Sequence, residues 1–193
     1  ETKAAADIET VTPGKLTVAT SPDFAPYEFY AIGEDGTPKL AGFDMDVAQY
    51  IADYLGLELE VVTVDFDGVI SELQTKSVDL GMAGLSPDEK RMGIMDFSDL
   101  YYMGGQSLVT VKDNAEKYNS FEAINKPDVS VGAQVGSIQM DLANENSPEA
   151  DIVGLPKVTD IISELLTGKM DAAYIETDVA KSYQKNYPEL TLV

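Results

Sequence analysis

The stretch GMAGLSPDEKR at residues 81–91 carries the most information about this chain. A short apolar strand runs into Ala-Gly-Leu-Ser, a Pro-Asp turn follows, and one helical turn then carries Arg91. The sequence has 13 lysine and arginine residues against 34 aspartate and glutamate residues, so an arginine just past a strand end needs a reason. The Ser86 hydroxyl and the rigid donor fork of Arg91 are suited to hold a small carboxylate. The alternative is a surface arginine on a solvated helix, which is the usual state of a lone arginine.

Composition excludes several classes of protein. The chain has no cysteine, which excludes disulfides, thiol catalysis and thiolate metal sites, and no histidine, which removes the commonest general base and zinc ligand. A net charge of −21 argues against nucleic acid or an anionic membrane as partner. We therefore expect no cofactor, no metal and no nucleic-acid partner, and a soluble protein outside the cytoplasm.

Strand and helix patterns alternate along the chain, which favours an α/β fold with parallel strands. Apolar residues at helical spacing indicate the helices, and short apolar runs indicate the strands. The predicted strands cover residues 16–20, 59–64, 78–83, 104–111, 129–133, 151–155 and 171–175, and the predicted helices cover 44–55, 68–75, 137–146, 158–166 and 177–187.

We divide the sequence into a tether at 1–13, a first lobe at 14–104 and a second lobe at 105–193. The tether is polar and alanine-rich, with no core pattern. A segment rich in glycine and aromatic residues, 102–111, is the predicted hinge.

A short internal repeat supports two lobes of similar plan. LQTKSVD at 73–79 and LLTGKMD at 165–171 share the pattern Leu-x-Thr-x-x-apolar-Asp, although a match this short also arises by chance. Residues five to seven beyond each aspartate fall at the far end of a strand, where open α/β sheets bind ligands. Those positions are Gly84 and Ser86 in the first lobe and Glu176 in the second.

Three motifs together resemble one family. GFDMDVA at 42–48, FDGVI at 66–70 and the stretch at 81–91 stand in the order and spacing of the extracellular solute-binding proteins of polar amino-acid ABC importers, family 3. The resemblance covers residues 14–193. It implies a two-lobed, type II periplasmic-binding-protein fold in which each lobe is a mostly parallel sheet flanked by helices.

The resemblance also implies a function. Two lobes close on a free polar amino acid, here with a lean toward a basic one, and present it to an ABC transporter permease. Such a protein is expected to be a monomer without enzymatic activity, lipid-tethered to the membrane in its full-length form. Relatives continue beyond the end of this chain to complete the first lobe, so we expect exposed apolar surface there.

In the first lobe, the resemblance assigns Arg91 to the ligand carboxylate with Ser86 as its hydroxyl partner. The Gly84 carbonyl is a second partner for the ligand ammonium, and Phe24 and Phe66 sandwich the side chain. An aromatic residue is, however, more often part of the core.

Two positions depart from the family pattern. Asp88 stands where the family often has threonine, and we interpret it as a helix N-cap rather than a ligand contact. Ser21 replaces an aspartate found in several relatives that bind basic amino acids or glutamine, which leaves the side-chain specificity open.

The second lobe has two candidate sites. Gly136 in QVGSI at 134–138 allows a close backbone approach, so the amides of Ser137 and Ile138 form a candidate anion site, with an ordinary turn as the alternative. In the family this turn, including Gln134, binds ligand. Glu176 is assigned to the ligand ammonium, with a solvated acid at a helix N-terminus as the alternative.

Two other functions stay open. Cyclohexadienyl dehydratases resemble this family and use a cleft acid as proton donor, a role that a desolvated Glu176 would suit. A sensory input domain would differ only in what is fused to it.

Overall fold

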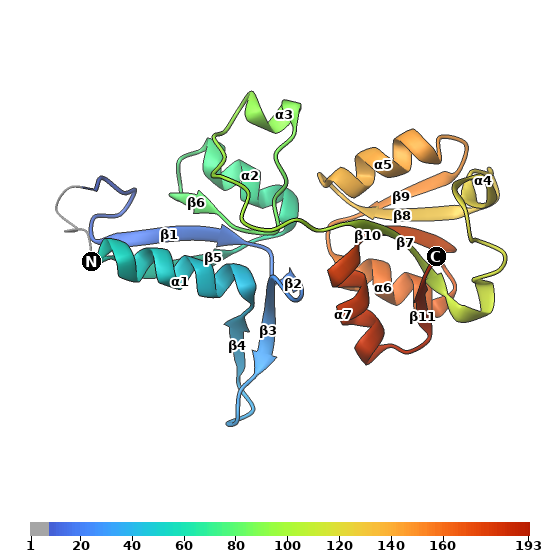
Figure 1. Cartoon of the computed structure of the whole chain (residues 1–193), viewed down its shortest axis with the longest axis horizontal. Coiled ribbons are helices and arrows are strands. Elements are labelled where there is room, and N and C mark those ends of the chain that lie inside the picture. Colours follow the sequence, from blue (N-terminus) through green and yellow to red (C-terminus); the bar gives the residue numbers. More distant parts are fainter. Residues whose placement is uncertain (1–7) are drawn as a thin grey trace. The chain divides into compact units, whose positions relative to one another are not determined.

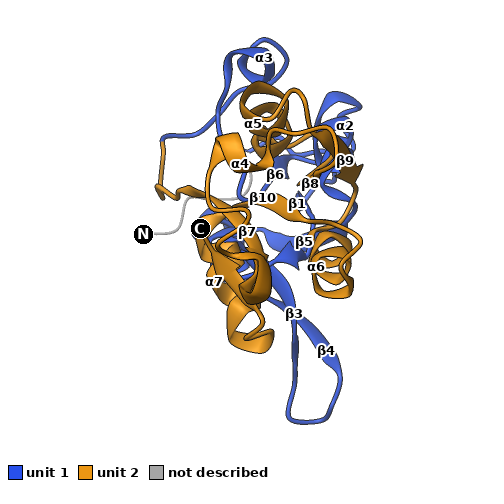
Figure 2. Ribbon diagram, turned by 90° about the vertical axis from the view of Figure 1, so that its right-hand side faces the viewer, with its two compact units in different colours: residues 1–99 blue, residues 100–193 orange. Residues whose placement is uncertain are grey.

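The computed structural model describes residues 8–193 and forms two compact units, residues 1–99 (unit 1) and 100–193 (unit 2) (Figure 2). Residues 1–7 of the predicted tether lie outside the described residues. In its remainder, Ile8 packs against an apolar cluster of unit 1, and the Val11 N–H donates to Asp79 at 2.8 Å. The predicted lobe boundary at 104–105 and the predicted hinge stay predictions.

The main sheet of unit 1 is parallel. Its strands, in the order β5-β1-β6, are β5 (Glu58–Thr63), β1 (Lys15–Thr20) and β6 (Leu80–Gly81) (Figure 1). Both faces of the central strand β1 are covered, because successive side chains of a strand point to opposite faces. Val18 packs with α1 (Phe43–Leu55), and Ala19 packs with α2 (Phe66–Gln74).

Unit 1 also contains a small antiparallel sheet that the sequence analysis does not predict. It comprises β2 (Asp23–Phe24), β3 (Glu28–Ile32) and β4 (Pro38–Ala41). The turn between β3 and β4 closes with a hydrogen bond from the Gly33 N–H to the Thr37 carbonyl at 2.8 Å. A single-turn helix, α3 (Glu89–Met92), follows β6.

Unit 2 has a five-stranded mixed sheet in the order β11-β7-β10-β8-β9. Strands β10, β8 and β9 run parallel, whereas β7 and β11 are antiparallel to their neighbours. The predicted α/β fold is thus confirmed, with a mixed rather than a mostly parallel sheet in unit 2. The strands are β7 (Gln106–Val111), β8 (Ser130–Gln134), β9 (Asp151–Leu155), β10 (Ala172–Glu176) and β11 (Leu190–Leu192).

The helices of unit 2 cover its sheet. Apolar side chains of α5 pack with β8 and β10, and Ile161 and Leu165 of α6 are fully buried. The helical elements are η2 (Lys112–Asn114), α4 (Phe121–Ile124), α5 (Ile138–Asn146), α6 (Val158–Thr167) and α7 (Thr177–Asn186). Within residues 8–193, no helix has both the length and the apolar character needed to cross a membrane.

The short internal repeat has a structural counterpart. Asp79 precedes β6, and its carboxylate accepts the Thr17 N–H of β1 at 2.8 Å. Asp171 precedes β10, and its carboxylate accepts the Ser130 N–H of β8 at 2.9 Å. Each aspartate therefore links the start of its own strand to the neighbouring parallel strand through a side-chain hydrogen bond.

Candidate functional site

Three parallel strands bring candidate residues of unit 1 to one edge of the sheet. Ser21 directly follows β1, Phe66 begins α2 soon after β5, and Gly84 follows β6. Because the carboxyl ends of parallel strands meet at the same edge, this edge is where such a sheet binds ligands. The alternation of strands and helices in the sequence therefore also places these residues at the same edge of the sheet.

Arg91 is buried, with 6% of its surface exposed, so the surface alternative is wrong. Its Nη1 donates to the Ser86 carbonyl at 2.8 Å, and its Nε lies 3.3 Å from Asp88 Oδ2. The guanidinium carbon lies 5.8 Å from the centre of the Phe66 ring, within the range of a cation–π contact. Three different groups thus fix the orientation of this guanidinium.

Asp88 is the N-cap of α3, as predicted, since its Oδ1 accepts the Arg91 N–H at 2.8 Å. Asp88 makes a second contact that was not predicted, the ion pair with the Arg91 side chain. The three-residue spacing of the two residues carries that signal, because residues three apart share a helix face. Ser86 contacts Arg91 through its backbone carbonyl, a group that the hydroxyl-based prediction does not consider.

Gly84 lies against the ring of Phe24. Its φ of +59° is in the left-handed region, and a Cβ there would sit 2.7 Å from Phe24 Cε1. Phe24 is buried and stacks on Tyr27 at 5.6 Å, while the Gly84 N–H donates to Asp44 Oδ2 at 2.9 Å. The left-handed φ and the close approach of the Phe24 ring both favour glycine at this position.

Ser21 is buried, and its hydroxyl donates to Asp23 Oδ1 at 3.1 Å. An acid is therefore present two residues beyond the position where some relatives carry aspartate. Sequence comparison at position 21 alone does not reveal it.

The edge of the unit 2 sheet carries Glu176, the last residue of β10. Glu176 is 6% exposed, so the alternative of a solvated acid is wrong. Its Oε2 accepts the Val179 N–H at 2.9 Å, which makes it the N-cap of α7. A carboxylate at a helix N-terminus is stabilised by the helix dipole.

The turn at 134–138 lies at the same edge, where β8 ends. Gln134 is buried and its amide donates to the Pro156 carbonyl at 3.1 Å. Gly136 has a φ of +76°, and Ser137 is the N-cap of α5, accepting the Met140 N–H at 3.3 Å. The Ser137 N–H donates to the Gln134 carbonyl and is therefore already engaged within the turn. Of the two amides of the predicted anion site, the amide of Ile138 is the one that begins helix α5.

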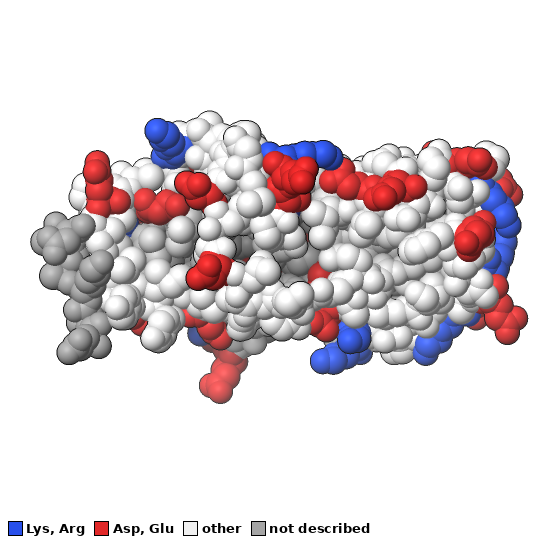
Figure 3. All heavy atoms as spheres, turned by 45° about the horizontal axis from the view of Figure 1, so that its top comes forward, with Lys and Arg blue, Asp and Glu red and all other residues white. Residues whose placement is uncertain are grey.

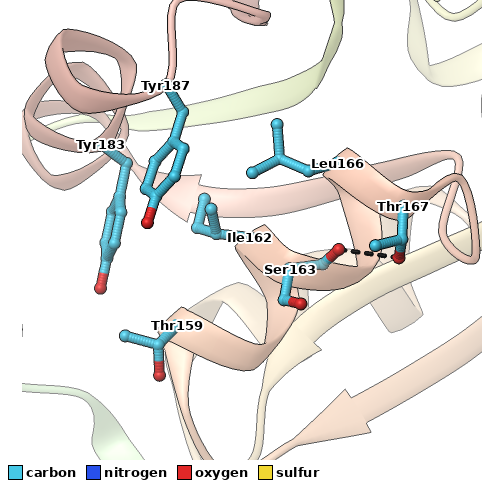
Figure 4. A pocket seen from close by; sticks show the side chains of 7 residues that line it. All are labelled: Thr159, Ile162, Ser163, Leu166, Thr167, Tyr183 and Tyr187. Atoms are coloured by element: carbon cyan, nitrogen blue, oxygen red, sulfur yellow. Dashed lines mark hydrogen bonds between the residues drawn. The ribbon is translucent and has the colours of Figure 1, made fainter.

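A cavity of about 260 Å³ in unit 2 lies away from these residues, between α6 and α7 (Figure 4). Its lining contains no charged side chain, so it offers no ionic partner to a carboxylate or an ammonium. The described residues also contain no cluster of three or more acidic side chains arranged to hold a metal ion. The lining residues are Thr159, Ile162, Ser163, Leu166, Thr167, Tyr183 and Tyr187.

Acidic side chains are scattered over both units on the face drawn in Figure 3, with few basic ones among them. Together with the net charge of −21, this surface attracts cations and repels anions over long range. Binding of a carboxylate to such a surface therefore needs a local positive group.

Comparison with known proteins gives consistent results. The arginine-binding extracellular protein ArtP of Bacillus subtilis is 35% identical over 91% of this chain, and the cyclohexadienyl dehydratase of Pseudomonas aeruginosa is 29% identical over 93%. The chain spans 66% of the length of each. The substrate-binding protein AbpA of an amino acid ABC transporter from Streptococcus pneumoniae, with L-arginine bound, is 36% identical, with a TM-score of 0.89 over 93% of this chain and 75% of that one.

The family match extends over most of the sequence, from residue 16 to residue 190. It covers most of each unit and includes all ten candidate binding residues. The chain belongs to the bacterial extracellular solute-binding proteins, family 3.

Proposed function

We propose that this protein binds a free basic amino acid, with L-arginine as the first candidate, and delivers it to an ABC transporter permease. The observation that carries the proposal is the buried guanidinium of Arg91, held by Ser86, Asp88 and Phe66 at the ligand edge of unit 1. Keeping a buried arginine at a sheet edge is costly, and a carboxylate ligand is the partner that its donor fork matches.

Each unit contributes a different partner in this proposal. In unit 1, Arg91 binds the carboxylate, the Gly84 carbonyl accepts from the ammonium, and Phe24 and Phe66 contact the side chain. In unit 2, Glu176 accepts from the ammonium. Gln134, Ser137 and Ile138, with Ser21 of unit 1, supply the remaining polar contacts.

Three observations favour a basic side chain. The aromatic rings of Phe24 and Tyr27 form a stacked pair, and a guanidinium stacks well on such faces. Of the similar proteins, ArtP is named as an arginine-binding protein, and the crystal structure of AbpA contains bound L-arginine. The strongly negative net charge adds long-range attraction for a cationic ligand.

We further propose that the protein does no chemistry on its ligand. A glutamate paired with an ammonium favours its charged form and is then a poor proton donor at neutral pH. The likeness to a cyclohexadienyl dehydratase makes proton donation by Glu176 the alternative.

Calorimetry and thermal shift test the proposal together. We expect L-arginine to bind and to raise the free energy of unfolding by about 2.7 kcal/mol at a hundredfold excess over Kd. Lysine, histidine, ornithine and neutral citrulline are the matched comparison ligands. Absence of binding by any amino acid would contradict the proposal. Conversion of prephenate or arogenate that disappears in Glu176→Gln would establish the enzymatic alternative.

A further inference from the structure

Unit 1 buries an acidic residue that the proposed function does not use. Glu28, the first residue of β3, has no exposed surface. No donor group among the described residues reaches either of its carboxyl oxygens. A buried carboxylate without a donor loses its hydration and gains nothing in return, so the charged form is strongly disfavoured.

The carboxyl group that contacts Glu28 belongs to Asp44 of α1, which is also fully buried. Two ionised carboxylates accept hydrogen bonds only, so a hydrogen bond between these side chains requires one proton. Asp44 has independent reasons to carry the charge, because it lies in the first turn of α1 and accepts the Gly84 N–H at 2.9 Å. Glu28 has neither advantage.

The charges around Glu28 act in the same direction. Burial raises the pKa of Glu28 well above its usual value, and the negative charges of Asp44 on α1 and Asp23 on β2 raise this pKa further. Burial and both neighbouring charges therefore favour the protonated form of this side chain.

We infer that Glu28 is a positioning residue for the ligand edge of unit 1: its protonated carboxyl donates to Asp44, and this contact keeps Asp44 on the Gly84 N–H. The inference rests on the proposed function in one respect, the role of Gly84 in ligand binding. The backbone connects the same groups, since the Asp44 N–H donates to the Tyr27 carbonyl at 2.9 Å and Phe24 pairs with Glu28 across the small sheet. Loss of the proton would place two negative charges beneath the hairpin that carries Phe24.

The first test follows the proton without ligand. In the 193-residue chain labelled with carboxyl-¹³C glutamate, the Glu28 resonance is assigned by its absence in Glu28→Gln. We expect it to keep the chemical shift of a protonated carboxyl at pH 7, well above the ordinary pKa of a glutamate side chain. A Glu28 resonance that titrates near that ordinary pKa would overturn the inference.

The second test measures positioning through the hydrogen exchange of the Gly84 amide. Glu28→Leu removes the donor, and we expect Gly84 to exchange roughly tenfold faster, the loss of one hydrogen bond. Glu28→Gln keeps a donor toward Asp44 and should restore slow exchange, and Glu34→Gln is the matched exposed control. Equal acceleration at Val131 in unit 2 would indicate general unfolding and overturn the specific role, as would unchanged exchange at Gly84.

The third test adds L-arginine. We expect Glu28→Leu to weaken binding roughly tenfold and Glu28→Gln to recover most of that loss. We also expect the affinity of the parent chain to fall at alkaline pH and that of Glu28→Gln to fall less. A parent chain that binds no arginine would defeat the proposed function while the two ligand-free tests still decide the proton pair. An affinity insensitive to Glu28→Leu would overturn the positioning role.

Discussion

The two units contain the same short motif and use it differently. In both, a helix ends, an aspartate fastens the next strand to its parallel neighbour, and the candidate site lies five residues further on. In unit 1 that fifth residue is Gly84, which offers only backbone groups. In unit 2 it is Glu176, which caps a ten-residue helix. The same scaffold therefore presents a backbone group in one unit and a charged side chain in the other.

The difference has a consequence for how each charge is held. Glu176 is positioned by the strand–helix junction itself, because its cap bond belongs to α7. Arg91 lies on a helix of four residues, which is too short to be stable alone, and it needs Asp88, Ser86 and Phe66 to hold it. Substitutions in the two units should separate these two modes of positioning.

The largest effect is expected for Arg91→Ala. Removing one partner of a buried charged pair should weaken L-arginine binding by about 2–4 kcal/mol, roughly 30- to 1000-fold, by calorimetry. Agmatine, which is arginine without the carboxylate, sharpens the test, since its affinity should be nearly the same in the parent and the variant. Exposed Lys90→Ala is the neighbouring control. A loss below threefold would remove Arg91 from the site.

Glu176→Gln should have the next largest effect. The amide oxygen can still cap α7, whereas the charge that pairs with the ammonium is lost, so we expect about 1.5–3 kcal/mol weaker binding. The cost to folding should be smaller, about 0.3–1 kcal/mol from the helix dipole. With 5-guanidinopentanoic acid, which lacks the ammonium, parent and variant should bind alike. An equal loss with both ligands would assign Glu176 a structural role only.

The repeated aspartates offer a comparison of stability. Asp171→Ala leaves the buried Tyr118 hydroxyl and the Ser130 N–H without their acceptor, and we expect a loss of about 2–3 kcal/mol in the free energy of unfolding. Asp79→Ala should cost less, about 1–2 kcal/mol, because one of its partners is the N–H of exposed Val11. Hydrogen exchange should show each loss in the unit that carries the substitution. An equal loss of unfolding free energy in the control Asp113→Ala, at an exposed aspartate, would contradict this role.

The smallest expected effect is at the helix ends of the repeat. Lys76 has a φ of +58° and Gly168, its counterpart, a φ of +72°. A lysine in the left-handed region is strained, and glycine relieves that strain. Glycine also raises the conformational entropy of the unfolded chain, so we expect Lys76→Gly to stabilise unit 1 by only about 0.5 kcal/mol. Gly168→Ala should destabilise unit 2 by about 1 kcal/mol. Urea unfolding measures both, and changes of the same sign would contradict the comparison.

The sequence predicted the elements whose apolar pattern is strong. The helices at 44–55 and 158–166 match the observed elements to within a residue, because each has one continuous buried face. The strand at 151–155 also matches, although its apolar side chains are only partly buried. The hairpin of β3 and β4 was not predicted, since Glu28 is the only buried residue of its two strands and no buried face repeats along them. Its signal was the glycine pair at 33 and 36.

The candidate site was only partly predictable. A resemblance places Arg91 and Glu176, and the fold buries both, but their partners depend on backbone geometry. The Ser86 carbonyl that contacts Arg91 is a group that every residue type has, so no sequence pattern marks it. Likewise, the contact between Glu28 and Asp44 joins residues sixteen positions apart, and it arises because Gly42 lets α1 start against Tyr27.

Asp88 contacts both the main chain and the side chain of Arg91, one with each carboxylate oxygen. A free arginine side chain samples many rotamers, and confining it costs about 2 kcal/mol of entropy. Here that entropy is lost when unit 1 folds, before any ligand arrives. A carboxylate that meets this guanidinium does not have to order it, so the free energy of each new hydrogen bond goes into affinity.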